Sequence, residues 1–486
     1  MVSVFPSIDR RVATIAGASG LVALAGILTI GFVHPIPVLA ALGFFLALAA
    51  VLFAPLPTLV VLLFVVPFHN VIFVFAQNKE HLSTGPLTFW KDALIIALFV
   101  RAVGGRLVAE RRLRLPRAAG DKFVLLYIVA YTIFAVRSPA GPTVYRALGR
   151  SIEGPLLFFA IRYLRPTRKQ LWYCVVAILG AASVIGTVAL IERLGPHQGL
   201  QTWYGADAPA RNSSFFIGSN GYRSGSFLGS PLILAFYLAG VTPFAVAISI
   251  LRPRWRPAAL LGLGVCGGGL IVTVTRSGLI GGGMGILIVL YLAVRNQRVK
   301  AALIGMIVVA ATTVVAYFLA GGSETLVRTS STSGHRAAIE RDLQQIEARP
   351  FGYGLGTTDA LQQRFKLASA PGATESVYLA KALEGGIPAL LLYMLVLYVT
   401  GMRLRSARRH ALWRGDREAA VLAAGALGAM IGIALAGLFL GVQELVVEVV
   451  LWALPGIALA AGATGAESLS VARPQRPTHL RPALIP

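Results

Sequence analysis

The chain has 486 residues, of which 56% are hydrophobic and 13% are charged, and its mean hydropathy is +0.74. Apolar runs of about 20 residues recur along it, and because such runs cross a bilayer core of about 30 Å as helices, this composition excludes a soluble globular domain. The formal net charge of +24 is compatible with nucleic-acid binding, but the Lys and Arg residues fall in short clusters between apolar runs, a pattern typical of membrane topology. We therefore expect an all-α, polytopic transmembrane protein that contacts the lipid bilayer and binds no nucleic acid.

Taken in chain order, the apolar runs predict about fourteen membrane-spanning helices, with both termini in the cytoplasm. They are expected at residues 12–33, 36–54, 57–76, 88–104, 121–137, 150–164, 171–192, 228–250, 257–274, 277–295, 301–320, 376–401, 418–438 and 444–463. No convincing cleavage site follows the first run, so we expect it to be retained as a helix and not removed as a signal peptide.

The spans divide the chain into groups of helices separated by two long external loops. The expected order is N-terminal helices over 1–192, a first external loop over 193–227, central helices over 228–320, a large and partly helical external loop over 321–375, C-terminal helices over 376–463, and a disordered basic cytoplasmic tail over 464–486. Four spans separate the two external loops, so they lie on one side of the membrane and can build one site together.

Short loops rich in Arg and Lys mark the cytoplasmic side. The predicted inner loops carry such clusters within 101–117, 165–169, 252–256, 295–300 and 403–417. None of these loops is large enough to fold as a nucleotide-binding domain, and the sequence has no Walker-type Gly-rich motif with its Lys, so we expect neither ATP-driven chemistry nor a cofactor. The two cysteines, Cys174 and Cys266, lie inside apolar runs, where we expect core packing and neither a disulfide nor a metal site.

Four charged residues on the external side are candidates for a functional site. Arg223 lies in the segment YRSGSFLGSP before the eighth span, and Arg276 lies in the tight turn TRSG between spans nine and ten. Arg336 opens an amphipathic stretch that runs to Arg349, and Glu375 lies where the span 376–401 begins. Arginine is not favoured on this side by topology, so these positions need another explanation.

Each candidate also has an ordinary structural interpretation. Arg276 can extend to the lipid phosphates from a helix end. Arg336 can pair with Glu340 one helical turn later. Glu375 can act only as a favourable charge at the start of a helix.

The four candidates together are more informative than any one of them. Three arginines from separate segments and one carboxylate at the same membrane face would form a positive pocket beside a possible base. Guanidinium groups bind phosphate oxygens with two parallel hydrogen bonds. The sequence therefore predicts a site for a phosphate or diphosphate at the level of the external headgroups, with a lipid-linked diphosphate as the obvious ligand.

Several motifs together resemble the family of O-antigen ligase and O-antigen polymerase-like membrane proteins. The segment from Arg223 to Pro231 resembles the family's Arg-x-x-Gly-x-Phe-x-x-Pro segment, and TRSG at 275–278 resembles its Ser-Arg-Gly-type turn. The stretch from Arg336 to Gly356 resembles the external helix and the Pro-Leu-x-Gly-x-Gly loop of the family, and ESVYL at 375–379 with LEGGI at 383–387 resembles its His-Asn-x-Tyr-Leu and following Gly pattern.

This resemblance implies a bacterial inner-membrane glycosyltransferase whose active site faces the periplasm. It implies transfer of a glycan from an undecaprenyl diphosphate carrier to a hydroxyl of another glycan or of a lipid-core acceptor, without a metal ion. In that scheme Arg223 and Arg336 hold the diphosphate, Arg276 supports them, and Glu375 deprotonates the acceptor hydroxyl. The ligases carry a catalytic His where this chain has Glu375, which favours the polymerase slightly over the ligase.

Two other classes of protein remain open. A transporter or flippase for a lipid-linked or anionic solute would be expected to carry charged residues at the bilayer midplane and broken helices in matching halves. A structural scaffold of an envelope complex would leave the external arginines without a role.

Overall fold

The computed structural model describes residues 35–72, 89–110, 119–141, 143–195, 216–217, 221–294, 296–299, 301, 305, 329–358, 374–439, 441 and 444–471. The α-helices are α2 (Pro35–Phe53), α3 (Pro55–Val65), α6 (Trp90–Glu110), α7 (Ala119–Val136), α8 (Thr143–Tyr163), α9 (Arg168–Leu194), α11 (Pro231–Leu251), α12 (Arg256–Val272), α13 (Arg276–Ala293), α15 (Thr329–Ala348), α17 (Val377–Trp413), α18 (Arg417–Ala436) and α19 (Leu445–Val471). Three 3-10 turns, η1 (Val66–Phe68), η4 (Ser226–Leu228) and η5 (Pro253–Trp255), and one ribbon of β1 (Phe216–Ile217) and β2 (Gly221–Tyr222) complete the described elements.

The fold is that of an all-α polytopic membrane protein. Twelve of the predicted spans coincide with described helices, whereas 12–33 and, apart from residues 301 and 305, 301–320 lie outside the described residues. Eight of the described helices are long and apolar enough to cross a membrane. The total of fourteen spans stays a prediction, and the two short strands in the first long loop were not expected.

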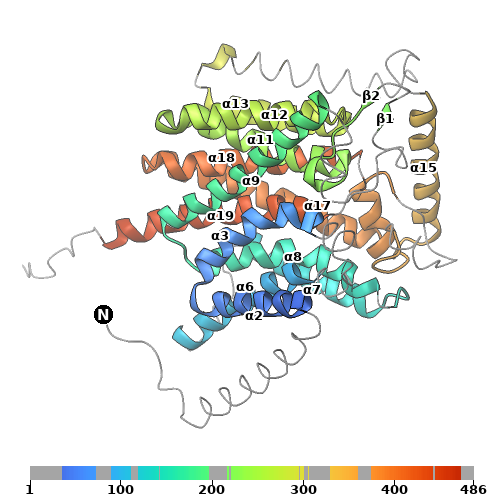
Figure 1. Ribbon diagram of the computed structural model, residues 1–486, viewed down its shortest axis with the longest axis horizontal. Helices are drawn as coiled ribbons and strands as arrows, with labels where there is room; N and C mark the ends of the chain where they lie inside the picture. The colour runs from blue at the N-terminus through green and yellow to red at the C-terminus, as the bar shows by residue number, and fades with distance from the viewer. Residues whose placement is uncertain are drawn as a thin grey trace, which may run out of the picture.

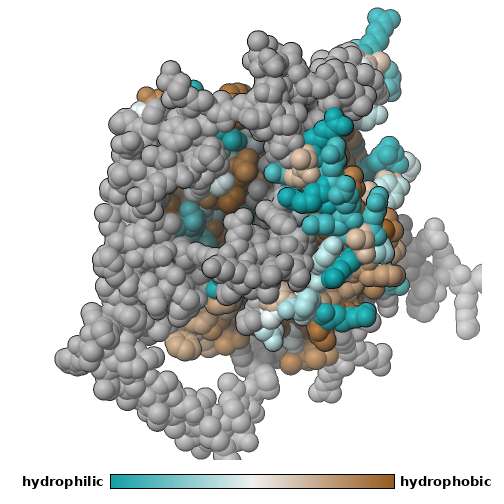
Figure 2. All heavy atoms as spheres, turned by 90° about the vertical axis from the view of Figure 1, so that its right-hand side faces the viewer, coloured by the Kyte–Doolittle hydropathy of each residue, from teal (hydrophilic) through white to brown (hydrophobic). Residues whose placement is uncertain are grey.

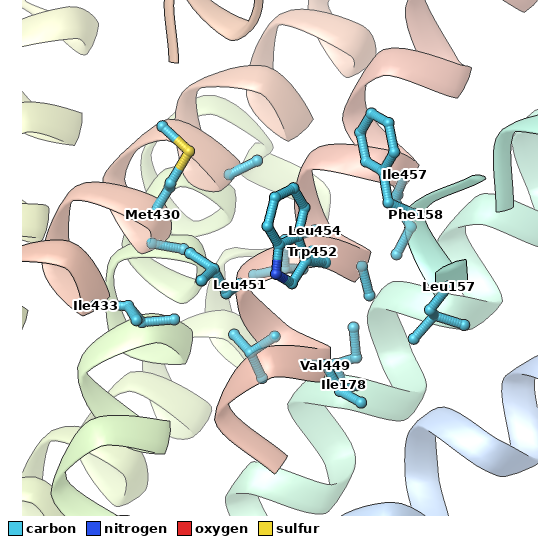
Figure 3. Close-up of a cluster of buried hydrophobic side chains, with 14 of the residues drawn as sticks. Leu157, Phe158, Ile178, Met430, Ile433, Val449, Leu451, Trp452, Leu454 and Ile457 are labelled. Carbon is cyan, nitrogen blue, oxygen red and sulfur yellow. The ribbon is translucent and has the colours of Figure 1, made fainter. Parts of the chain in front are cut away.

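The spans lie side by side, and α15 crosses one end of the bundle nearly at right angles to them (Figure 1). We call this end of the molecule the α15 end. The core is formed by α11, α18 and α19, the helices with the largest buried share among the candidate spans. Figure 3 shows part of it, where Trp452 and Leu451 of α19 lie among Phe158 of α8 and Met430 of α18.

Glycines bring α13 and α18 into unusually close contact. A Cβ atom at Gly428 would lie 2.8 Å from the carbonyl oxygen of Gly285, and one at Gly432 would lie 3.0 Å from that of Gly281. Between helices in lipid, where apolar burial gives little driving force, small residues allow the backbones to approach and gain van der Waals contact. This contact fixes the start of α13 beside the end of α18, which matters for the site below.

Ion pairs join the helices at the end of the bundle opposite α15. Arg168 at the start of α9 binds both carboxylate oxygens of Asp416, at 3.0 and 2.6 Å, and Asp416 also accepts a hydrogen bond from Ala419 N as the N-cap of α18. Arg162 and Arg403 both bind Asp121. These arginines belong to the predicted inner clusters or flank them, and their meeting at one end agrees with the predicted alternation of the spans.

The predicted span 376–401 coincides with α17, but α17 is broken at Gly386, which was not predicted. The backbone there has φ 77° and ψ −177°, which is outside the helical region. A first half-helix therefore runs over 377–385 and a long second part over 387–413. Pro388 explains part of this break, because its nitrogen carries no hydrogen to donate to the carbonyl oxygen of Glu384.

Candidate functional site

Two of the predicted site arginines lie at the same turn. Arg223 is half-buried, and its Nε donates to the carbonyl oxygen of Thr273 (2.9 Å) while Nη2 donates to Oγ1 of Thr275 (2.6 Å). Thr275 directly precedes Arg276, which is exposed and opens α13. The turn between α12 and α13 is tight, with φ 49° at Val274. The structure thus brings Arg223 and Arg276 to one place at a helix N-terminus, where the backbone also favours anions.

A buried acid holds the loop that carries Arg223. Glu192, in the last turn of α9, accepts hydrogen bonds from Ser224 Oγ (2.5 Å) and from the backbone N–H of Ser226 (2.9 Å). Ser226 Oγ in turn donates to the carbonyl oxygen of Ile185 (2.8 Å). Sequence analysis did not select Glu192, although an acid at the end of an otherwise apolar span was a usable signal.

Glu375 lies next to the outer turn of α18. The next residue, Ser376, is the N-cap of α17, where its side chain accepts from Tyr378 N and donates to the carbonyl oxygen of Gly437 (3.1 Å). Val377 N donates to the same carbonyl at 3.0 Å. Because Ser376 makes the capping hydrogen bond, the half-buried side chain of Glu375 is not needed as the N-cap of α17.

Arg276 and Glu375 flank the same helix end. Gly281, in the second turn of α13, faces Ala436 in the last turn of α18, with 2.9 Å between a Cβ built at Gly281 and the Ala436 Cβ. Arg276 lies five residues before Gly281, about 7.5 Å further along the helix axis. The contact therefore places Arg223, Arg276 and Glu375 together at the α15 end of the bundle.

Arg336 has the ordinary structural partner that its spacing predicted. It lies on α15, its side chain is 82% exposed, and Nε binds Glu340 Oε1 at 2.8 Å. On an exposed helix such a pair contributes about 0.3–0.5 kcal/mol. The structure does not bring Arg336 into contact with Arg223 or Glu375 through any described hydrogen bond or ion pair.

Asp342 is the residue of α15 that faces the bundle. Its side chain is fully buried, Oδ1 accepts from Arg341 Nη2 at 3.1 Å, and Oδ2 has no hydrogen-bond partner within the described residues. Burial raises the pKa of the Asp342 carboxyl above its usual value; Arg341 opposes this change and the nearby charge of Glu375 adds to it. The two carboxyls are therefore electrostatic neighbours.

Sequence reasoning missed Asp342, although its pattern was visible. Ile339 and Ile346 lie three residues before it and four residues after it, on the same face of the amphipathic helix. A carboxylate at the centre of an apolar face is unusual, since a buried charge destabilises the fold unless it is paired or functional.

A second polar group lies deeper in the bundle, beneath the start of α17. Lys381 is buried over the Tyr131 ring, 4.9 Å from its centroid, and interacts with the carboxylates of Glu384 and Glu448. Glu448 lies in the first turn of α19 and accepts from Trp452 Nε1 at 2.9 Å. Lys381 and Glu384 lie three residues apart in the first half of α17, and Glu448 joins them through the packing of α17 against α19.

Hydrophilic side chains gather on part of the described surface at this end. Figure 2 views the molecule from the α15 end and shows them on the right of the view, with hydrophobic residues beside them. An acid, a tight turn with two arginines and a helix N-terminus can together bind an anion and accept a proton.

Part of the chain matches a known family. Residues 258–394 match the family described as O-antigen ligase. The matched segment contains α12, α13, α15 and the first part of α17, and with them Arg276, Asp342 and Glu375, whereas Arg223 lies before it. No curated protein matches the chain in sequence.

Proposed function

We propose that this chain, an O-antigen ligase-like multi-pass membrane protein, transfers a glycan from a lipid-linked diphosphate to an acceptor sugar hydroxyl at the α15 end of the bundle. The observation that carries the proposal is the hydrogen bond from Arg223 to Thr275, next to Arg276, at the start of α13, which packs against the end of α18 where the start of α17, next to Glu375, is also bound. The family match over residues 258–394 supports a glycan-transfer function.

The donor is an undecaprenyl diphosphate-linked glycan in this proposal. Arg276 and the start of α13 bind the diphosphate, with Arg223 fixed beside them by its bonds to the turn. Negative charge develops on the leaving phosphate oxygen during transfer, so arginines that bind it more tightly in the transition state lower the barrier. The site lies at the periplasmic side of a bacterial inner membrane.

Glu375 is the general base of the reaction. Its carboxylate takes the proton of the acceptor hydroxyl, the acceptor oxygen forms a bond to the anomeric carbon, and the bond from that carbon to the diphosphate breaks. The lipid diphosphate leaves with the electron pair and needs no ATP, because the bond that breaks supplies the driving force. A base placed in this way contributes about 10²–10⁴-fold to the rate.

Arg336 has a smaller part than the sequence alone suggested. Its exposed side chain pairs with Glu340 in the structure, so we place it at the entrance, where it can reach the donor when bound. The acceptor is another lipid-linked glycan in a polymerase and a lipid-core sugar in a ligase. The family match does not favour the transporter or flippase.

The proposal is tested in cells that make the polymer, with Glu375→Gln and Arg223→Ala as the variants. Both are expected to stop glycan transfer while the protein stays in the membrane, so that lipid-linked donor accumulates. Accumulation of single lipid-linked units indicates a polymerase, and accumulation of full-length lipid-linked polymer indicates a ligase.

The control is Arg254→Ala, a matched change at an exposed arginine in η5, before the start of α12 and at the opposite end from the site. It is expected to leave the polymer unchanged. Normal polymer in both site variants would contradict the proposed mechanism.

A further inference from the structure

The break in α17 leaves backbone groups that a continuous helix would satisfy. In an unbroken helix the carbonyl oxygens of Leu383 and Glu384 would accept from residues 387 and 388. Here residue 388 is proline, and Ile387 N donates instead to the carbonyl oxygen of Pro350 at 2.8 Å. Such groups must find other partners, because an unsatisfied backbone group in a membrane protein is strongly unfavourable.

A loop from another part of the chain supplies these partners. We call residues 350–358 the glycine loop. Tyr353 N donates to the carbonyl oxygen of Leu383 at 2.7 Å, and Gly354 N donates to that of Glu384 at 3.0 Å. Gly352 must be glycine for this approach, since a Cβ there would lie 2.5 Å from Gly386 N. The glycine loop thus completes the broken helix.

The side chain of Glu384 fastens the far part of the same loop. Its Oε1 accepts from the backbone N–H of Gly356 (3.2 Å) and from Thr358 Oγ1 (2.9 Å). The Glu384 side chain is buried and its charge is balanced by Lys381 nearby. A carboxylate that accepts two hydrogen bonds in a buried place holds its partners more firmly than neutral acceptors do.

The fastened loop continues directly from α15. Arg349 lies over the ring of Tyr353, 4.7 Å from its centroid, and Tyr353 OH donates to the carbonyl oxygen of Gln345 at 3.4 Å. The end of α15 is therefore fixed to the break in α17, while Asp342, two turns earlier, lies close enough to Glu375, before the start of the half-helix, for the two charges to interact.

The glycine loop and the two carboxyls connect α15 to the first half of α17 at two places. Eight residues separate Asp342 from Pro350, where the loop begins, and eleven residues separate Glu375 from Gly386, where α17 is broken. The loop joins the two segments at one place, and the electrostatic neighbours Asp342 and Glu375 lie at the other. Displacing the loop would move α15 relative to the base.

From these contacts we propose that Glu384 is a positioning residue, whose carboxylate clamps the glycine loop to the broken helix and so holds α15 and Glu375 in register for transfer. The inference rests on the proposed function, because Glu375 is the base in it. Glu384 does not touch the substrate. Its effect is on the chemical step and not on donor binding, which the arginines of the α12–α13 turn provide.

The test uses the full-length protein in lipid nanodiscs, with Glu384→Ala, Glu384→Gln and Thr358→Val as variants. Thr358→Val removes one hydrogen bond to Glu384 and leaves the carboxylate in place, so it remains informative if Glu384→Ala fails to fold. The controls are Glu347→Ala at an exposed position of α15 and Thr132→Val at an exposed position of α7. Two quantities are measured, amide hydrogen exchange in residues 350–358 and the kcat and KM for an undecaprenyl diphosphate-linked glycan.

The clamp predicts that Glu384→Ala and Thr358→Val speed exchange at Gly354 and Gly356 about 10-fold or more. It also predicts a loss of kcat of about 100-fold for Glu384→Ala, with KM changed less than about 2-fold, because misplacement of a reacting group by 1 Å has effects of this size. Glu384→Gln keeps an acceptor oxygen and is expected to recover most of kcat, and the controls are expected to behave as the wild type.

Three results for Glu384→Ala would overturn the proposal. The first is faster amide exchange in residues 350–358 with an unchanged kcat, and the second is a rise in KM without a fall in kcat. The third is amide exchange in residues 350–358 that is the same as in the wild type. A wild-type protein that makes no product from this donor would refute the proposed function instead, and the exchange measurement would still decide whether the clamp exists.

Discussion

Replacing Gly386 by alanine tests the broken helix at its most sensitive point. The conformation at Gly386, φ 77° and ψ −177°, is one that only glycine adopts readily, and holding another residue there costs about 1–3 kcal/mol. The new Cβ would also lie 2.6 Å from Phe351 Cα, a distance that forces the glycine loop to move.

The free-energy change expected from this variant follows from these contacts. If the loop detaches, the backbone hydrogen bonds to Leu383 and Glu384 are lost, each contributing about 1 kcal/mol. The closed state of the loop is then disfavoured by about 3–5 kcal/mol in total, which is a change of more than about 100-fold in its equilibrium. The helices on either side keep their packing, so the change is local.

The assay is hydrogen exchange at Tyr353 and Gly354 together with glycan transfer by the same preparation. Gly386→Ala is expected to speed exchange at both amides about 100-fold and to reduce transfer, with a small change in Tm. Gly283→Ala is the control, because a Cβ at Gly283 in α13 meets nothing within 4 Å and alanine favours a helix. Wild-type exchange and transfer in Gly386→Ala would refute the role assigned to the break.

Asp342→Asn is expected to raise Tm at neutral pH and to lower glycan transfer. Because the pKa of Asp342 is raised in the folded protein, the gain in Tm should vanish as the pH falls below the usual Asp pKa. A lower Tm of the variant at pH 7 would contradict this. Gly428→Leu is expected to separate α13 from α18 and to lower Tm by several degrees, measured in detergent. Burial tends to raise the pKa of Asp416, but Arg168 and the N-cap hydrogen bond hold it below its usual value. Asp416→Asn should therefore lower Tm at pH 7, with the difference lost as the pH falls through the folded pKa, and an equal difference at all pH values would exclude this origin.

Much of the fold followed from hydropathy alone. Apolar runs of the right length predicted the positions of the described spans, because a bilayer imposes both helix and length on the chain, although helices such as α8 and α17 extend beyond the predicted bounds by seven and twelve residues. The break at Gly386 could not be predicted from hydropathy, although Gly385, Gly386 and Pro388 are helix-weakening residues. Such residues also occur in helices that only kink, and the glycine loop that satisfies the freed backbone groups comes from a distant segment.

The candidate site residues were predicted to share one side of the membrane, and their roles stay predictions. Topology predicted Arg223, Arg276, Arg336 and Glu375 on one side, and the structure places all four at the α15 end. The hydrogen bond from Arg223 to the turn before Arg276 could not be predicted from sequence spacing. The ion pair of Arg336 with Glu340 could be predicted in this way, because residues four apart share a helix face.

Averaged hydropathy did not predict the polar layer of Lys381, Glu384 and Glu448, because a few charges change little in the mean of an apolar helix. Lys381 and Glu384 are neighbours on α17, and only the packing of α17 against α19 brings Glu448 to them. Buried charges of this kind are retained where they serve a purpose, since their burial costs several kcal/mol unless compensated. At Glu384 the purpose we assign is the clamp on the glycine loop.

The most direct test measures glycan transfer by the purified protein in nanodiscs. The donor is an undecaprenyl diphosphate-linked glycan with a radiolabelled sugar, and an acceptor glycan is supplied. The wild type is expected to release one lipid diphosphate for each glycan joined to the acceptor, without ATP. Glu375→Gln is expected to slow both by about 10²–10⁴-fold while still binding the donor. Release of lipid diphosphate without glycan transfer, or equal rates in the wild type and in Glu375→Gln, would contradict the assignment of Glu375 as the base.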